Sequence, residues 1–284
     1  MQRREFLGTG CAAGAAAIGA MATTGPAALA AATAGAGEAA KKQVLEWRLY
    51  RLDAGAMRQQ FEKFLADAAI PAFNRIGARP VGVFGLMEGT PATKSAGAAG
   101  QMEVGPADLY VLLPHESAES LATAAQRLAA DAEYQKAGAA VINAEKAAPA
   151  YKRIETWLML AFDAVPRVEA PTKKESRIFQ LRTYESHSDA KAAKKMEMFN
   201  TGGELAVFRR SAMNPVFFGQ TLAGTKMPNL TYMLGFDDAD AQKAAWDKFG
   251  KDPEWTKLST DPQYKDTVSN ITNIMLKPAA CSQI

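Results

Sequence analysis

The second half of this sequence repeats the first, and this duplication restricts the fold more than any other feature of the 284 residues. VLEWRLYR at 44–51 aligns with IFQLRTYE at 178–185. RLAADAEYQKAG at 127–138 is a looser copy of KFGKDPEWTKLS at 248–259, and both contain Asp, any residue, Glu and an aromatic. Self-similarity of this kind indicates that one structural unit occurs twice.

Each half has the same order of strand and helix patterns. In the first half, alternation and β-type residues predict strands within 44–50, 79–85, 107–113 and 153–160. Apolar residues at helical spacing predict one helix over 54–69, which Pro71 bends or ends, and a second along the stripe from Leu121 to Leu128. The resulting order is βαββαβ, the split ferredoxin-like arrangement.

A unit of this kind covers one face of its antiparallel sheet with helices and leaves the other face bare. Two fused copies can cover each other's bare faces, whereas either copy alone would expose an apolar sheet to water. The fold class predicted is therefore α+β, with two fused ferredoxin-like βαββαβ units forming a pseudo-dimeric α/β barrel. We expect domains at 42–162 and 177–278, joined by a linker at 163–176 that contains two prolines and mixed charge.

Residues 1–40 differ in composition from the rest of the chain. Arg3 and Arg4 precede Glu5, and an Ala/Gly-rich run follows, which resembles a twin-arginine export signal. We expect cleavage near 28–30 or within the tract that ends at 40, with an uncleaved anchor as the alternative. The mature protein is then expected to be periplasmic or secreted.

Charge and motif content exclude several classes of partner and cofactor. The 33 basic and 30 acidic residues give a net charge of +3, which is no electrostatic footprint for nucleic acid. No apolar run after the signal is long enough for a membrane helix, so no membrane partner is expected. Glycine-rich phosphate loops, dinucleotide fingerprints and metal-ligand patterns are missing from the sequence, so we expect no cofactor and no metal.

Several segments resemble the NIPSNAP family of dimeric α/β-barrel proteins. They are the Arg-any-Tyr ending of the first strand, the Asn-Pro-Val at 214–216, YMLGFDDADAQKAAWDKFGKDPEW at 232–255 and the closing NIMLKP. The second half matches over most of its length and the first half more loosely. The resemblance implies the ferredoxin-like fold and self-pairing, with a homo-oligomer left open. It implies no single reaction, because this barrel superfamily includes monooxygenases, haem proteins and proteins without a known ligand.

The candidate site is the polar face of the first strand in each half. Alternate strand residues point to opposite faces of a sheet. The apolar face is predicted to contact the helices, and it carries Leu45, Trp47, Leu49, Phe179, Leu181 and Thr183. The opposite face is predicted to line the space between the sheets, and it carries the candidate ligand-binding residues Glu46, Arg48, Tyr50, Gln180, Arg182 and Tyr184.

Two interpretations of these arginines stay open. Glu46 can pair with Arg48, whereas Arg182 has only Gln180 beside it and needs another acid or an anionic ligand. The functional interpretation is a polar lumen that binds a small anionic or amphipathic molecule. The structural interpretation is an ion pair that fixes strand register or the interface of the halves.

Other polar residues are predicted to have structural roles. His115 and His187 are expected to be solvated loop residues, with haem ligation or general-base action as alternatives. Ser188 or Asp189 is expected to cap a helix rather than to join a catalytic triad. Asp252 is expected to cap a helical turn that starts at Pro253.

These observations lead to three functional hypotheses. The first is an exported binding or interaction protein that holds a small organic or anionic molecule between its two sheets. The alternative is a cofactor-independent oxygenase or isomerase, in which the tyrosines and arginines position a substrate and stabilise an enolate-like anion. The third is a scaffold whose outer faces bind other proteins.

Overall fold

The structure is a computed structural model, and it describes residues 41–89 and 104–284. Residues 40–284 form one compact unit. The expected export signal lies outside the described residues, as does the segment 90–103 of the long loop in the first half. Of the helices in the described part, none combines the length and apolar character needed to cross a membrane.

The first half has the predicted βαββαβ order. Pro71 does not end the first helical segment, because it lies in the first turn of α2, where its missing N–H is tolerated. The elements are β1 (Val44–Arg51), α1 (Ala56–Phe64), the π-helical η1 (Leu65–Ala69), α2 (Ile70–Arg75), β2 (Gly82–Leu86), β3 (Leu109–His115), α3 (Ala118–Ala129), α4 (Ala132–Ala137), α5 (Ala139–Ile142) and β4 (Arg153–Ala161).

The second half follows the same order. Gly203 separates its first two helices with a φ of 102°, a left-handed conformation that glycine adopts readily. The elements are β5 (Ile178–Glu185), α6 (Asp189–Asn200), α7 (Glu204–Arg210), β6 (Asn214–Ala223), β7 (Asn229–Phe236), α8 (Ala239–Gly250), α9 (Pro253–Ser259), the 3-10 helix η2 (Pro262–Tyr264) and β8 (Asn270–Pro278).

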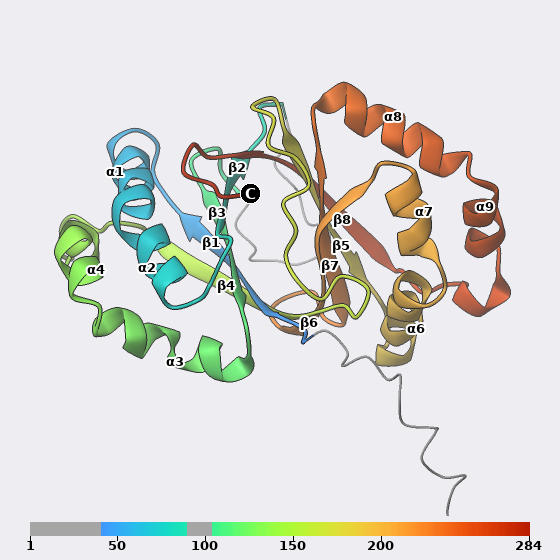
Figure 1. The fold of residues 1–284 in the computed structure, drawn as a ribbon, viewed down its shortest axis with the longest axis horizontal. Coiled ribbons are helices and arrows are strands. Elements are labelled where there is room, and N and C mark those ends of the chain that lie inside the picture. Colours follow the sequence, from blue (N-terminus) through green and yellow to red (C-terminus); the bar gives the residue numbers. More distant parts are fainter. Residues whose placement is uncertain (1–40, 90–103) are drawn as a thin grey trace, which may run out of the picture. The chain divides into compact units, whose positions relative to one another are not determined.

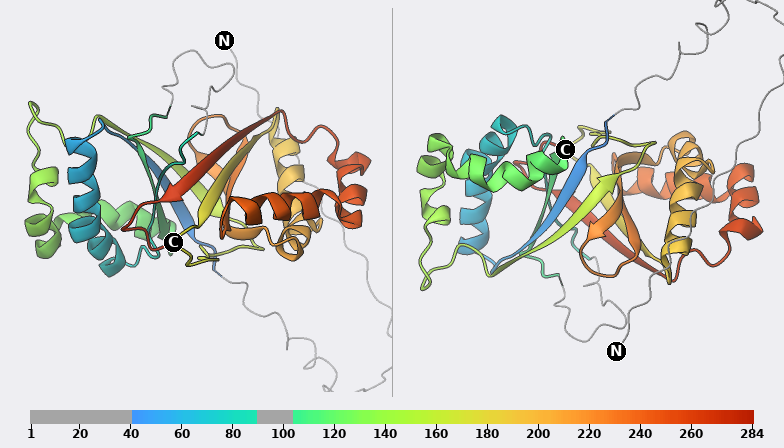
Figure 2. Two further views of the ribbon diagram at one scale, coloured as in Figure 1. Left: turned by 90° about the horizontal axis from the view of Figure 1, so that it is seen from above. Right: turned by 90° about the horizontal axis from the view of Figure 1, so that it is seen from below.

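The eight strands close into one antiparallel barrel in the order β1-β3-β2-β8-β5-β7-β6-β4. The halves are joined twice, where β2 pairs with β8 and where β4 pairs with β6. Helices α1 to α4 lie on one side of the strands and α6 to α9 on the other (Figure 1), and both views in Figure 2 show the strands between these two groups. The predicted pseudo-dimeric α/β barrel is confirmed.

Apolar side chains from both halves fill the barrel interior. Trp47 stacks on Tyr110 with 5.0 Å between ring centroids and meets Phe217 of the second half at 5.9 Å. Phe84 and Phe179 meet edge to face at 5.0 Å, again across the two halves. This barrel core draws on strands of both halves and contains no helix residue; it includes Leu45, Trp47, Leu49, Phe84, Tyr110, Leu112, Met159, Phe179, Leu181, Phe217, Met233 and Leu276.

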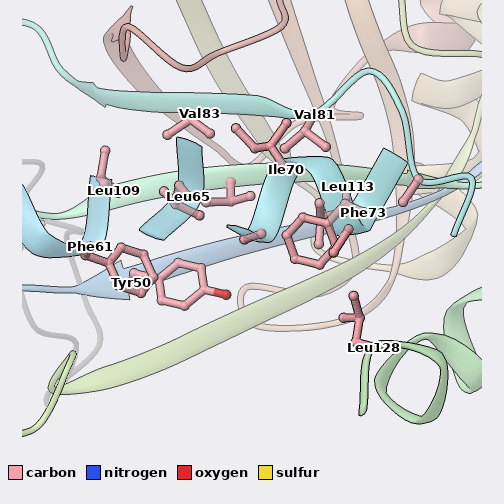
Figure 3. Close-up of a cluster of buried hydrophobic side chains, with 14 of the residues drawn as sticks. Tyr50, Phe61, Leu65, Ile70, Phe73, Val81, Val83, Leu109, Leu113 and Leu128 are labelled. Carbon is pink, nitrogen blue, oxygen red and sulfur yellow. The ribbon is translucent and has the colours of Figure 1, made fainter. Parts of the chain in front are cut away.

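The predicted assignment of the two strand faces is wrong. The face of Trp47 lines the barrel core, and the face of Arg48 lies under the helices. Tyr50 packs against Phe61 of α1 at 4.6 Å between centroids, and Figure 3 shows the two rings side by side. The physical reason is that apolar side chains from both halves bury one another in the closed interior, which excludes the charged strand face.

The duplicated Asp-any-Glu-aromatic segments join two helices in each half. Asp131 caps α4 and holds Arg75 of α2 through both carboxylate oxygens, at 2.8 and 2.9 Å. In the second half, Asp252 caps α9, as predicted, and holds Arg210 of α7 at 2.7 and 2.6 Å. The following Glu133 and Glu254 each contact the same arginine. These segments are therefore structural.

Replacing Asp252 by asparagine is expected to lower the melting temperature at neutral pH but not at strongly acid pH. The hydrogen bond from Arg210 lowers the Asp252 pKa from 3.8 to about 2. A lowered folded-state pKa means that the stabilisation is present above 3.8 and is lost as the pH falls towards 2. Melting curves of both proteins across this range test the prediction, and a pH-independent difference between them would contradict it.

Candidate ligand-binding site

Arg182 of β5 lies between two aromatic rings beneath the second-half helices. Its guanidinium carbon is 4.7 Å from the ring centroid of Trp246 on α8 and 5.2 Å from that of Tyr184 on its own strand. Both contacts are cation–π interactions, which supply no oxygen or nitrogen acceptor to the N–H groups of the guanidinium.

Those N–H groups have no acceptor in the part of the chain that the structure describes. The Nε atom of Arg182 is buried and has no hydrogen-bond partner. No described carboxylate forms an ion pair with this guanidinium, although the residue is only partly buried. An arginine in such surroundings normally pairs with an acid, so the missing partner indicates a place for an anion.

Gln180 does not supply the acceptor, because its amide is used elsewhere. Its Oε1 accepts hydrogen bonds from Trp246 Nε1 at 2.6 Å and Gln242 Nε2 at 3.4 Å. Its Nε2 donates to Asn273 Oδ1 at 2.8 Å. These bonds turn the amide towards α8 and β8, and they fix the indole of Trp246 over Arg182.

A second cation in this region is compensated. Lys195 of α6 pairs with Glu204 of α7 at 2.7 Å, and both side chains are almost fully buried. Lys195 also lies over the ring of Phe199 at 4.5 Å. Burial raises the pKa of Glu204, and the nearby charges of Lys195 and Arg182 oppose that rise. With Lys195 paired to Glu204, the charge of Arg182 is the uncompensated one of the three.

Two tyrosine hydroxyls complete this side of the sheet. Tyr184 and Tyr232, on neighbouring strands, share a hydrogen bond of 2.9 Å between their oxygens. Burial raises the pKa of both phenols, so they stay neutral at ordinary pH. One hydroxyl donates to the other, and the second keeps a proton to donate onward. We call this group the Arg182 site; it comprises Gln180, Arg182, Tyr184, Lys195, Glu204, Tyr232 and Trp246.

The corresponding residues of the first half satisfy one another. Arg48 Nε and Nη2 donate to the two carboxylate oxygens of Glu46 at 2.7 and 2.9 Å, and Nη1 donates to the Tyr50 hydroxyl at 3.1 Å. Burial alone would raise the pKa of Glu46, but hydrogen bonds with His115 and Arg48 outweigh burial and lower it. This Arg48 cluster fits the structural interpretation, because its charges are paired internally.

His115 corrects a second expectation. It is 1% exposed instead of solvated, and its Nε2 lies 3.1 Å from Glu46 Oε2, while its Nδ1 is buried without a partner. Strand alternation could have predicted this position. His115 lies on the same face of β3 as Leu113, and Leu113 lies opposite Glu46 of β1. The expectations for His187 and Ser188 are confirmed. His187 is exposed, and Ser188 caps α6.

The structure therefore places the six predicted residues in two separate groups, one under each set of helices. Four members of the Arg182 site were missed by the sequence analysis: Lys195, Glu204, Tyr232 and Trp246. The described residues contain no group of three or more His, Cys, Asp or Glu side chains that could hold a metal ion.

Comparisons with solved structures find similar proteins of low sequence identity. A putative monooxygenase from Fusobacterium nucleatum is 7% identical, with a TM-score of 0.51, over 84% of this chain and 93% of that one. A putative monooxygenase from Lactobacillus acidophilus is 12% identical, with a TM-score of 0.50, over 84% and 94%. An uncharacterised NIPSNAP-like domain protein from Burkholderia xenovorans is 18% identical, with a TM-score of 0.34, over 37% and 88%.

The first two structures show that this chain shares their fold. The comparison with curated proteins finds no match. Residues 179–283, which carry the whole Arg182 site, match the NIPSNAP family model.

Proposed function

We propose that this protein binds a small organic anion at the Arg182 site. The observation that carries the proposal is the unpartnered guanidinium of Arg182, held between the rings of Trp246 and Tyr184. A charge-assisted hydrogen bond from a fixed arginine is among the stronger contacts available to an anionic ligand. The flanking rings favour a ligand with a flat apolar body next to its charge.

The proposed location differs from the space between the two sheets. The side chains of the barrel core occupy that space, and its polar content is low. The helix-covered face instead brings together a cation, hydroxyl donors and aromatic rings within a few ångströms. A few convergent polar groups in apolar surroundings are typical of small-molecule sites.

Replacing Arg182 by methionine is expected to weaken binding of a small aromatic anion about tenfold or more, because a hydrogen bond to a charged group is lost. Isothermal titration with benzoate measures this affinity. Arg209→Met is the matched control, since Arg209 is an exposed arginine that pairs with Glu169 away from the site. Equal benzoate affinity in all three proteins, or no binding by any, would contradict the proposal.

A second candidate function is a cofactor-independent oxygenase or isomerase at the same residues. Two features favour it: the buried Glu204, whose raised pKa suits a general base, and the shared fold with two putative monooxygenases. Glu204 would take a proton from an enolisable ketone, and Arg182 with the tyrosine hydroxyls would hold the enolate oxygen. Solvent deuterium incorporation into a 1,3-diketone, lost in Glu204→Gln, would support this activity over binding alone.

The remaining expectations are also proposals. We infer that both halves are NIPSNAP-like domains, since the first half has the same βαββαβ order as the matched second half. We infer that residues 1–40 direct export to the periplasm or beyond, with the twin-arginine pattern as the support. Twin-lysine replacement of Arg3 and Arg4 should therefore retain the protein in the cytoplasm. Light scattering of the exported form would establish whether it self-associates.

A further inference from the structure

We infer that the ligand of the Arg182 site is a flat monocarboxylate, and that Glu46 of the first half is a built-in copy of its carboxylate. This inference rests on the proposed function and makes it more specific. It comes from comparing two arginines at corresponding places in the barrel, Arg48 on β1 and Arg182 on β5.

The two arginines occupy equivalent positions. Each is the fifth residue of the first strand of its βαββαβ unit, and each guanidinium lies under helices of its own half. Two residues earlier, Glu46 lies opposite Leu113, and Gln180 lies opposite Leu234. On the strand face that carries each arginine, the main difference is therefore one carboxylate, present in the first half and replaced by an amide in the second.

The Arg48 cluster shows how a carboxylate fits such an arginine. Glu46 takes the side of the guanidinium formed by Nε and Nη2, one oxygen to each nitrogen, at 2.7 and 2.9 Å. In the second half the corresponding Nε of Arg182 is the buried atom without a partner. The group missing there is a pair of oxygens with one negative charge, which a carboxylate provides.

The charged side chains near each arginine indicate that the ligand carries one negative charge. The Arg48 cluster pairs one guanidinium with one carboxylate. The Arg182 site has two cations, Arg182 and Lys195, and one carboxylate, Glu204. A ligand with one negative charge would therefore make the Arg182 site electrically neutral, whereas a doubly charged phosphate would leave it with a net negative charge.

The aromatic rings around Arg182 indicate the shape of the uncharged part of the ligand. Trp246 is held over the guanidinium by its bond to Gln180, and the Tyr184 ring lies on the same cation. Large rigid aromatic faces recognise planar apolar groups with little loss of side-chain entropy. Aryl and conjugated unsaturated monocarboxylates therefore fit the site better than short aliphatic acids.

An exchange of the two differing residues tests the inference. Gln180→Glu should supply an internal carboxylate to Arg182 and lower benzoate affinity at least about tenfold. Glu46→Gln should free Arg48 and raise the number of benzoate sites from one to two. Gln220→Glu is the matched control for the first variant, because it makes the same substitution at an exposed position of β6 and should leave affinity unchanged.

Titration calorimetry with benzoate, with benzamide as the uncharged analogue, measures both affinity and stoichiometry. Unchanged benzoate affinity in Gln180→Glu, or equal affinity for benzamide and benzoate in the wild type, would overturn the inference while leaving the Arg182→Met result to decide the proposed function. Tighter binding of phenyl phosphate than of benzoate would also overturn it. If Glu46→Gln does not fold, as a circular-dichroism melt would show, Gln180→Glu alone decides.

Discussion

Replacing Lys195 by methionine is expected to destabilise the protein by about 3–5 kcal/mol at neutral pH, because the carboxylate of Glu204 then stays buried without its partner. The two side chains are 6% and 2% exposed, so water cannot take over the role of the lysine. No other basic side chain forms an ion pair with Glu204 among the described residues, and Arg182 acts on it only at longer range. The loss should therefore exceed that of any surface pair in this chain.

The loss should also depend on pH in a defined direction. Burial raises the pKa of Glu204 above 4.5, and removing Lys195 takes away the main influence that lowers it. A raised folded-state pKa means that the protonated carboxyl favours the folded state below 4.5 and that stability is lost as the pH rises through the folded-state value. The deficit of Lys195→Met should shrink in acid.

Urea unfolding of the wild type and three variants measures this effect. Lys195→Met and Glu204→Met are the single variants, and the double variant removes both charges. Replacing a whole buried pair by apolar groups is often neutral, so the double variant should recover most of the lost stability. A double variant that is as unstable as Lys195→Met would show that the cost comes from packing and not from the unpaired charge.

The predicted repeat made the fold predictable, because strand alternation and helical spacing are both local properties of the sequence. Alternation in 44–50 and helical spacing in 54–69 each identify an element without knowledge of its neighbours. Because the second half has the same order of elements, only a few arrangements let each half cover the bare sheet face of the other. The closed barrel with β2 beside β8 and β4 beside β6 is one of them.

The orientation of the strand faces was not predictable in the same way. Alternation shows that Arg48 and Trp47 point to opposite faces, but it does not say which face is inside the barrel. The polar face was predicted to line a lumen, but the barrel interior is a packed core where Trp47 is 3% exposed. What decides the orientation is the burial of the two apolar strand faces against each other inside the closed barrel, and this depends on tertiary packing.

Residues of the Arg182 site show why four of its seven members were missed. Lys194 and Lys195 are neighbours in one helix, yet Lys194 is partly exposed and pairs with Glu197, whereas Lys195 is 5% exposed. The helical period distinguishes them, because Lys195 lies on the buried stripe of α6 with Ala192, Met198 and Phe199. The placement of α7 then supplies its partner, Glu204. Gln180 and Arg182 were found from strand alternation, and the helical period could have found Lys195 in the same way. Its pairing with Glu204 could not be found so, because it depends on how two helices pack.

Truncating Trp47 to alanine is expected to cost about 3–5 kcal/mol of unfolding free energy, the range typical of removing a large aromatic side chain from a packed core. Its indole contacts Tyr110 and Phe84 of its own half and Phe217 of the other, so the cavity would open where the halves meet. A single cooperative unfolding transition is expected to persist at a lower urea concentration, since residues 40–284 form one unit.

Two controls separate a core role from a general loss of apolar surface. Trp47→Phe keeps a ring beside Tyr110 and leaves a smaller cavity, so its loss should be clearly less than that of Trp47→Ala. Ile271→Ala removes an apolar side chain that is 45% exposed on β8, and it should change stability by less than about 0.5 kcal/mol. If Trp47→Ala were as mild as Ile271→Ala, the space between the two sheets would be loosely filled rather than packed. A ligand site inside the barrel, as the strand pattern first predicted, would then have to be reconsidered against the Arg182 site.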